Sequence, residues 1–247
     1  MASADGHAVP AQSFGRAALE YERGRPGWPE EALDLVPVPP DATVLDLGAG
    51  TGKLTRVLAR RYRRVLAIEP LEHLRTILAA SAPSAEVLDG AAEAIPLRDE
   101  ALDAVFAAQA FHWFANDEAV AEIARVLRPD GVLALLWNEA VEPSPLPAAY
   151  RARLGELRRS VQFTSPEEGH AVLARGGFEE LRSASVQHEQ VSLRSDVLAF
   201  AASVSWIAHR PEAERRRILA ELADLLPEGE YRFPLRAEVS WTRRARV

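Results

Sequence analysis

The stretch VLDLGAGTG, residues 44–52, decides the fold of this chain of 247 residues. The apolar run Thr43–Leu47 is rich in strand-forming residues and ends at a glycine, which predicts a buried strand. The glycines at positions 48, 50 and 52 permit a tight turn in which a ligand can approach the backbone. Helical periodicity follows over Leu54–Tyr62. The sequence therefore predicts a strand, a glycine turn and a helix N-terminus in succession.

The residues around the glycine turn indicate which ligand it would hold. A dinucleotide fingerprint needs a small residue after Gly52, where this chain has Lys53, and a P-loop would need a G-K-[ST] sequence. Asp46 would repel a pyrophosphate but favours a cationic group. Glu69, at the end of the next predicted strand, is placed to accept hydrogen bonds from ribose hydroxyls. Together these residues predict S-adenosylmethionine (SAM). If the glycines are considered alone, the alternative is that they form a tight turn that binds no ligand.

Short predicted strands and helices alternate after this turn. Strands are expected at Thr43–Leu47, Val65–Ile68, Ala85–Leu88, Leu102–Ala107 and Val132–Trp137, and helices at Leu54–Tyr62, Leu71–Ala80 and Glu118–Leu127. This alternation predicts a parallel sheet with helices on both faces. Short helices are expected earlier, at Ser13–Glu22 and Glu30–Leu35. Later in the chain, helices are expected at Ala148–Ser160, from Pro166 to Gly176, at Leu193–Ser205 and at Glu212–Leu225, and strands at Phe178–Val191 and Arg232–Thr242.

Composition and charge exclude several kinds of protein. The 29 basic and 36 acidic residues give a net charge of −7, which argues against binding to a nucleic acid backbone. The chain has no cysteine, and its six histidines show no i, i+4 pair, so no metal is expected. The N-terminus lacks the features of a signal peptide, and no apolar run is long enough to span a membrane. We therefore expect a cytoplasmic protein, monomer or homodimer, that acts on a small molecule.

These motifs resemble those of class I SAM-dependent methyltransferases, in the small-molecule branch around the trans-aconitate and ubiquinone/menaquinone-type enzymes. The landmarks that carry the resemblance are residues 44–55, 67–70, 90–96, 108–114 and 125–131. The resemblance implies an α/β, Rossmann-like, doubly wound sheet of seven mixed strands in the order 3-2-1-4-5-7-6. Its last strand would be antiparallel, with Arg232–Thr242 as the candidate. It also implies N-terminal cap helices in residues 1–40, a SAM-binding core in 41–138, and helical insertions in 139–247 that complete the same domain and cap the substrate.

The resemblance further implies which residues bind SAM and its product, S-adenosylhomocysteine. They are Asp46, Gly48, Ala49, Gly50, Gly52, Glu69, Pro70, Ala91, Ala92, Glu93 and Gln109. One position departs from the family, because Ala91 stands where many members have an aspartate that binds the adenine amino group. Adenine would then rely on the backbone of Ala91 and Ala92, with Glu93. Asp89 lies two positions too early to take that role.

The end of the fourth predicted strand is expected near the transferred methyl group. His112 is the residue there with an ordinary pKa near neutrality, and it is expected to be a general base, a positioning or lining group, or a packed bystander. The predicted substrate and cap residues are Tyr21, Arg25, Trp28, Phe111 and Trp113. Arg25 could hold a carboxylate through two hydrogen bonds; a surface helix is the alternative for its segment.

The sequence therefore predicts methyl transfer to an O, N or C atom of a small molecule. The fourth strand lacks the Asn/Asp-Pro-Pro-Tyr motif of amino methyltransferases that act on nucleic acids, and the absence of cysteine excludes the cytosine C5 type. A SAM-binding regulatory or assembly protein without methyl transfer is the alternative. A nicotinamide oxidoreductase is disfavoured by Asp46 and Lys53.

Overall fold

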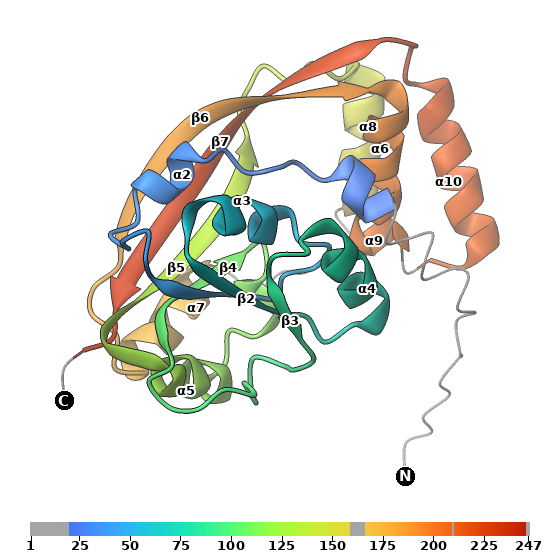
Figure 1. The fold of residues 1–247 in the computed structure, drawn as a ribbon. Helices are drawn as coiled ribbons and strands as arrows, with labels where there is room; N and C mark the ends of the chain where they lie inside the picture. Colours follow the sequence, from blue (N-terminus) through green and yellow to red (C-terminus); the bar gives the residue numbers. More distant parts are fainter. Residues whose placement is uncertain (1–19, 159–165, 209, 246–247) are drawn as a thin grey trace.

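A seven-stranded sheet runs through the structure in the order β3-β2-β1-β4-β5-β7-β6 (Figure 1). The computed structural model describes residues 20–158, 166–208 and 210–245. The strands are β1 (Thr43–Leu47), β2 (Arg64–Ile68), β3 (Glu86–Leu88), β4 (Leu102–Ala108), β5 (Leu127–Ala140), β6 (Arg182–Leu193) and β7 (Glu230–Arg243). The first five strands pair in parallel, and β7 is antiparallel to both β5 and β6. The predicted fold class, strand order and antiparallel last strand are confirmed.

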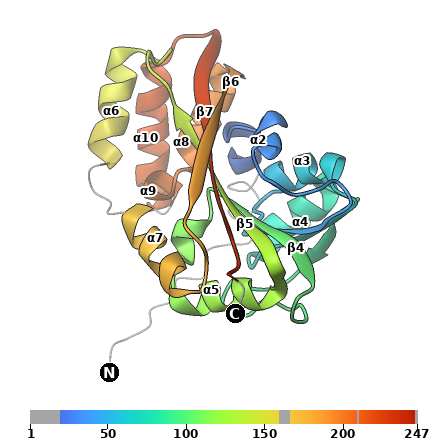
Figure 2. The same cartoon turned by 90° about the vertical axis from the view of Figure 1, so that its left-hand side faces the viewer.

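Helices cover both faces of the sheet, as Figure 2 shows. On one face lie α2 (Glu31–Asp34), α3 (Lys53–Arg61) and α4 (Glu72–Ser81), and on the other lie α5 (Asp117–Val126) and α7 (Pro166–Arg175). Because side chains alternate along a strand, β1 serves both faces. Leu45 and Leu47 pack into the cluster that contains α5, whereas Val44 packs into the cluster that contains α3. With both faces covered, β1 is buried throughout, which fixes the position of the glycine turn at its end.

Four further helices form a cap beside the sheet (Figures 1 and 2). They are α6 (Ala148–Arg158), α8 (Arg194–Ser203), α9 (Ser205–Ala208) and α10 (Glu212–Asp224). The cap has its own apolar cluster, which includes Tyr150, Val197 and Leu222. Its α6 precedes β6, and α8 follows β6 directly, since it begins at the residue after Leu193. No helix in the described part of the chain combines the length and apolar character that a membrane span requires.

The structure differs from the sequence prediction mainly at the ends of elements. β5 begins at Leu127 rather than at Val132, because Leu127 already pairs with β4 before a register shift. β6 begins at Arg182, and Phe178 contributes only an isolated bridge to Arg244. The 3-10 helix η1 (Phe111–Trp113) and the short α9 were not predicted. Residues 13–19 of the first predicted helix lie outside the described residues, and 20–24 are helical.

Candidate functional site

Three cavities meet at the carboxyl edge of the parallel strands. The loop cavity, about 260 Å³, is lined by Asp46, Ala49 and Lys53, among others. The strand cavity, about 520 Å³, is lined by Glu69, Pro70 and residues 90–93. The cap cavity, about 740 Å³, is lined by His112, Arg151 and Trp206. Tyr21 and Gln109 line all three, so the cavities share one junction.

Asp46 places a buried carboxyl group in the loop cavity. Its side chain is 1% exposed, and the Thr55 hydroxyl donates a hydrogen bond of 2.6 Å to it. Burial raises the pKa of Asp46 to about 7, the Thr55 hydrogen bond opposes this shift, and the nearby Glu69 charge adds to it. A carboxyl group held in this way is ready to be ionised by a cationic ligand group in the same cavity.

Glu69 is fixed at the end of β2 by two backbone donors. Its Oε2 accepts from the amide of Gly50 at 2.9 Å, and its Oε1 accepts from the amide of Leu71 at 3.0 Å. Each carboxylate oxygen can accept about two hydrogen bonds, so each keeps capacity for a ligand hydroxyl. The buried Glu69 therefore both holds the glycine turn and offers two acceptors to the strand cavity.

The glycines of the turn have different surroundings. A Cβ at Gly50, where φ is +59°, would face the Tyr21 ring at 3.7 Å and otherwise open space. A Cβ at Gly52 would lie 2.7 Å from Leu78 Cδ1 and 2.9 Å from Ser81 Oγ, on α4. Gly50 therefore borders ligand space. The structure places Gly52, which was expected to bind the cofactor, in packing between α3 and α4.

The far end of the strand cavity is built from residues 90–93. Ala91, Ala92 and Glu93 all line it, and the Glu93 carboxylate accepts a hydrogen bond of 2.9 Å from the Asn116 side chain. Asp89 is 73% exposed and forms an ion pair with Arg75 at 2.9 Å. Within the described residues, this end of the cavity therefore offers backbone groups and Glu93 rather than Asp89.

Residues 20–28, which we call the N-terminal strap, connect the cap to the core. Glu20 forms an ion pair with Arg215 of α10, and Arg23 pairs with Asp196 of α8 at 2.5 Å. Glu22 pairs with Arg56 of α3 at 2.8 Å. A Cβ at Gly24 would lie 2.1 Å from the backbone nitrogen of Phe200, so the strap and α8 cross in backbone contact. The strap is thereby fixed with Tyr21 and Arg25 in the cavity walls.

Gln109 lies at the cavity junction in a strained conformation, with φ at +52°. Its amide donates to the Leu136 carbonyl at 2.9 Å, and its side chain donates to the Asn138 carbonyl at 3.1 Å. Asn138 in turn donates to the carbonyl of Gly27 in the strap at 2.9 Å and contacts His188 Nε2 at 2.8 Å. Such strain persists only where neighbours over-determine it, often at a functional site. Sequence reasoning missed Asn138, since no motif marks it.

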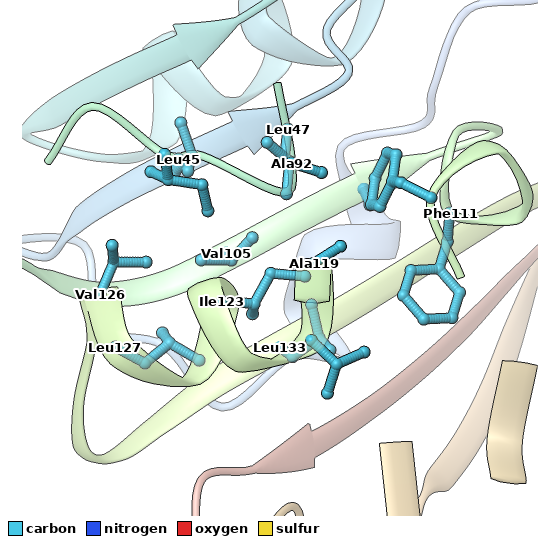
Figure 3. Close-up of a cluster of buried hydrophobic side chains, with 14 of the residues drawn as sticks. Leu45, Leu47, Ala92, Val105, Phe111, Ala119, Ile123, Val126, Leu127 and Leu133 are labelled. Carbon is cyan, nitrogen blue, oxygen red and sulfur yellow. The ribbon is translucent and has the colours of Figure 1, made fainter. Parts of the chain in front are cut away.

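The aromatic residues near η1 have different places. His112 and the 68% exposed Trp113 line the cap cavity, with ring centroids 4.8 Å apart. Burial and the Arg25 charge lower the pKa of His112, so its ring is neutral near pH 7. Phe111, expected as a substrate residue, is 3% exposed and packs edge-on against Phe114 in the core cluster of Figure 3. Its place after an exiting strand suggested a wall, but its ring turns into the apolar core.

The remaining predicted and unpredicted wall residues come from several segments. Trp28 lines the loop cavity. Gly48, a predicted cofactor-binding residue, borders both the loop cavity and the strand cavity. Wall residues that the sequence did not identify come from β5 and the cap: Trp137, Arg151, Arg158, Phe200, Ser203 and Trp206. The segments of all but Trp137 were predicted to wall the substrate, but the sequence did not identify which of their side chains point inward.

Comparisons with known proteins agree with this geometry. A family model described as a methyltransferase domain matches residues 45–135. An uncharacterized methyltransferase from Mycobacterium tuberculosis is 50% identical over 126 residues, 51% of this chain and 52% of that protein, so the chain spans about half the length of that relative. An uncharacterized methyltransferase from Schizosaccharomyces pombe is 33% identical over 221 residues, 87% of each chain. A solved candidate type II methyltransferase from Anaeromyxobacter dehalogenans is 28% identical, with 90% and 99% of the two chains covered and a TM-score of 0.66. The chain belongs to the class I SAM-dependent methyltransferases.

The donor set of the site fits SAM. A buried carboxyl group at Asp46 matches the ligand's cationic end, and the free acceptor capacity of Glu69 matches two ribose hydroxyls. Open space over Gly50 admits the ligand beside the backbone. In the described ranges, no three His, Asp or Glu side chains come together as a metal-binding group.

The raised pKa of Asp46 leads to a first prediction. The folded protein favours the protonated carboxyl, so Asp46 opposes folding increasingly as pH rises from about 4, its unfolded pKa, to about 7. Asp46→Asn should therefore raise the free energy of unfolding of the unliganded protein by a few kcal/mol at about pH 8, and change it little at about pH 4. Chemical denaturation at the two pH values measures both.

The same variant should bind SAM more weakly, by about 1.5–3 kcal/mol, because the charged partner is lost. Calorimetry at about pH 8 measures this change. Asp41→Asn, at an exposed position outside the cavities, is the control for removing one negative charge. A destabilised Asp46→Asn protein, or one that binds SAM as tightly as the wild type, would contradict the role given to this carboxyl group.

Proposed function

We propose that the protein transfers a methyl group from SAM to a small-molecule acceptor bound in the cap cavity. The observation that carries the proposal is the common junction of the three cavities at Tyr21 and Gln109. A ligand that fills the loop and strand cavities brings its centre to this junction. A second molecule in the cap cavity then meets it there, and alignment of the two reactants supplies most of what the transfer requires.

The residues of this chain have separable tasks in the proposal. When bound, SAM supplies a methyl group on a positively charged sulfur. Asp46 holds the cationic end of the ligand, and Glu69 holds the ribose. Tyr21 and Gln109 border the reacting centre, where the strained Gln109 is kept in place by Asn138. His112 borders the acceptor, and its neutral ring is available to orient it or to accept a proton.

The cap cavity favours this function over that of a SAM-binding regulatory or assembly protein. At about 740 Å³ it has the size of a small-molecule pocket, and it joins the cofactor space directly. A regulator without a second substrate has no need for such a cavity. The cap and strap supply its walls, and no domain for a macromolecular acceptor is required.

Two measurements test the proposal. Calorimetry should show micromolar binding of SAM and S-adenosylhomocysteine and no binding of NADH. A coupled assay for S-adenosylhomocysteine should then detect turnover with members of a panel of small acceptors. Binding of NADH without SAM would contradict the cofactor assignment. Tight SAM binding with turnover only on tRNA or DNA, at an affinity that falls steeply with salt, would contradict the acceptor assignment.

A further inference from the structure

Arg25 is a partly buried cation without a carboxylate partner among the described residues. Its guanidinium donates to the Ser203 hydroxyl at 3.2 Å and to the Ser203 carbonyl at 3.5 Å. The group also lies 5.1 Å from the ring centroids of both Tyr21 and Phe200. Burial lowers the pKa of Arg25, as expected for a charge removed from water. Because buried charges are usually paired, we expect Arg25 to pair with an anionic group of a bound ligand.

The cap cavity that Arg25 borders is positively charged. Its described lining contains three arginines, Arg25, Arg151 and Arg158, and no aspartate or glutamate. Arg151 forms a long ion pair of 3.9 Å with Glu142, whose side chain is 75% exposed. In a protein with a net charge of −7, an acid-free cavity with three arginines selects an anionic molecule by its potential.

Four large aromatic side chains form another part of the wall of the cap cavity. Trp113, Trp137, Trp206 and Phe200 line it from η1, β5, α9 and α8. Aromatic walls favour a planar or conjugated body, which gains from ring contacts beyond simple burial. The cavity therefore combines cationic groups for an anion with surfaces for a flat apolar group.

We propose that the acceptor is an aromatic or conjugated carboxylic acid whose carboxylate binds Arg25 and is itself methylated. The inference rests on the proposed function and names the substrate class of that site. Arg25 lines both the loop and the cap cavities, so an anion bound to it lies at the junction. A carboxylate oxygen forms the new bond to the methyl carbon, while the methyl–sulfur bond breaks and its electron pair remains on sulfur. The products are a methyl ester and S-adenosylhomocysteine, and no proton is transferred.

The carboxylate that binds Arg25 could come from the acceptor or from the methionine part of SAM. The loop cavity has its own cation in Lys53, whose Nζ lies 3.8 Å from Glu22 Oε1. Arg25 also lines the loop cavity but, unlike Lys53, it lines the cap cavity as well, together with the two other arginines. These positions favour Lys53 for the methionine carboxylate and Arg25 for the acceptor.

Binding of matched probes tests the charge preference. The probes are trans-cinnamate, its neutral amide and cinnamylamine, with phenylacetate, phenylacetamide and 2-phenylethylamine as a second series. Each is titrated into the full chain saturated with S-adenosylhomocysteine. The acids should bind at least about tenfold more tightly than the amides and amines, as expected for a charge-assisted contact. Equal or tighter binding of the neutral or cationic probes, or no binding of either acid at millimolar concentration, would overturn the proposal.

Arg25→Gln tests which ligand provides the carboxylate. The preference for acids should disappear in this variant, while its affinity for S-adenosylhomocysteine stays within about threefold of the wild type. Arg63→Gln, which removes an exposed charge at the opposite edge of the sheet, is the matched control and should keep the preference. If Arg25→Gln loses affinity for S-adenosylhomocysteine and keeps the preference for acids, Arg25 serves SAM and the inference is wrong. If the wild type itself does not bind S-adenosylhomocysteine, the result would instead count against the proposed function.

A carboxylate acceptor also decides the role of His112, because an ionised nucleophile needs no base. With a carboxylic acid that the enzyme methylates as the substrate, His112→Asn should lower kcat by less than about tenfold. Loss of a general base would instead lower kcat by about 10²–10⁴-fold. The wild-type rate should likewise show no rise through the pKa of an imidazole. A larger loss of kcat together with such a rise would exclude direct attack by a bound carboxylate.

Discussion

Gly50→Val should abolish SAM binding, with an affinity loss of more than about 100-fold. The position has a φ of +59°, and an added Cβ would stand 3.7 Å from the Tyr21 ring, in the space that the ligand needs. The valine methyl groups extend further into that space, so they collide with any ligand that lies on the turn. Calorimetry with SAM, supported by circular dichroism to verify folding, measures the loss.

The control for this variant is Gly177→Val. Gly177 also has a positive φ, +78°, but a Cβ there would meet nothing within 4 Å. Both substitutions place a branched residue in the left-handed region and should cost at least about 1–2 kcal/mol of stability. Only Gly50→Val should lose SAM. If Gly177→Val lost SAM binding to the same extent, the effect would be one of general destabilisation.

Gly24→Ala should lower turnover by at least about 100-fold although the residue lies outside the cavities. The new Cβ would be 2.1 Å from the nitrogen and 2.4 Å from the Cα of Phe200, and backbone atoms cannot move aside as a flexible side chain can. The strap must therefore lift from α8, which displaces Tyr21 and Arg25. Misplacement of about 1 Å in a catalytic site is enough for a loss of this size.

Gly27→Ala is the matched control within the strap, because a Cβ at Gly27 would have no neighbour within 4 Å. It should retain turnover within about twofold of the wild type, since its backbone carbonyl can still accept the Asn138 hydrogen bond. Denaturation curves of both variants separate a displaced strap from an unfolded protein. Normal turnover in Gly24→Ala would show that the strap does not control the site.

The sequence predicted the central sheet well, for identifiable reasons. β1 was predicted with its observed bounds, because it is short, mostly apolar and followed by glycines. Asp46 and Glu69 lie at the ends of such strands, and the carboxyl ends of parallel strands share one edge of the sheet. Short-range pattern was sufficient to bring them together.

The residues on the acceptor side of the site could not be predicted from local sequence patterns. Phe200 and Ser203, which contact Arg25, lie 175 and 178 positions from it along the sequence, and no local pattern encodes such a contact. Phe111 was assigned to the site by its position after β4, but the 3-10 turn rotates its ring into the core. Gly52 was grouped with the other glycines of the turn, yet its surroundings depend on where α4 packs.

The strap has a consequence for the order in which the protein is made. Its ion pairs with α8 and α10 join residues that are 173 and 195 positions apart in the sequence. Contacts so distant along the chain form late, since a long loop must be closed first. On the ribosome, β1 to β4 can assemble while the cap is still unsynthesised. The strap emerges before the cap and is among the last segments to dock, so the junction of the three cavities is completed only after α8 and α10 have been synthesised.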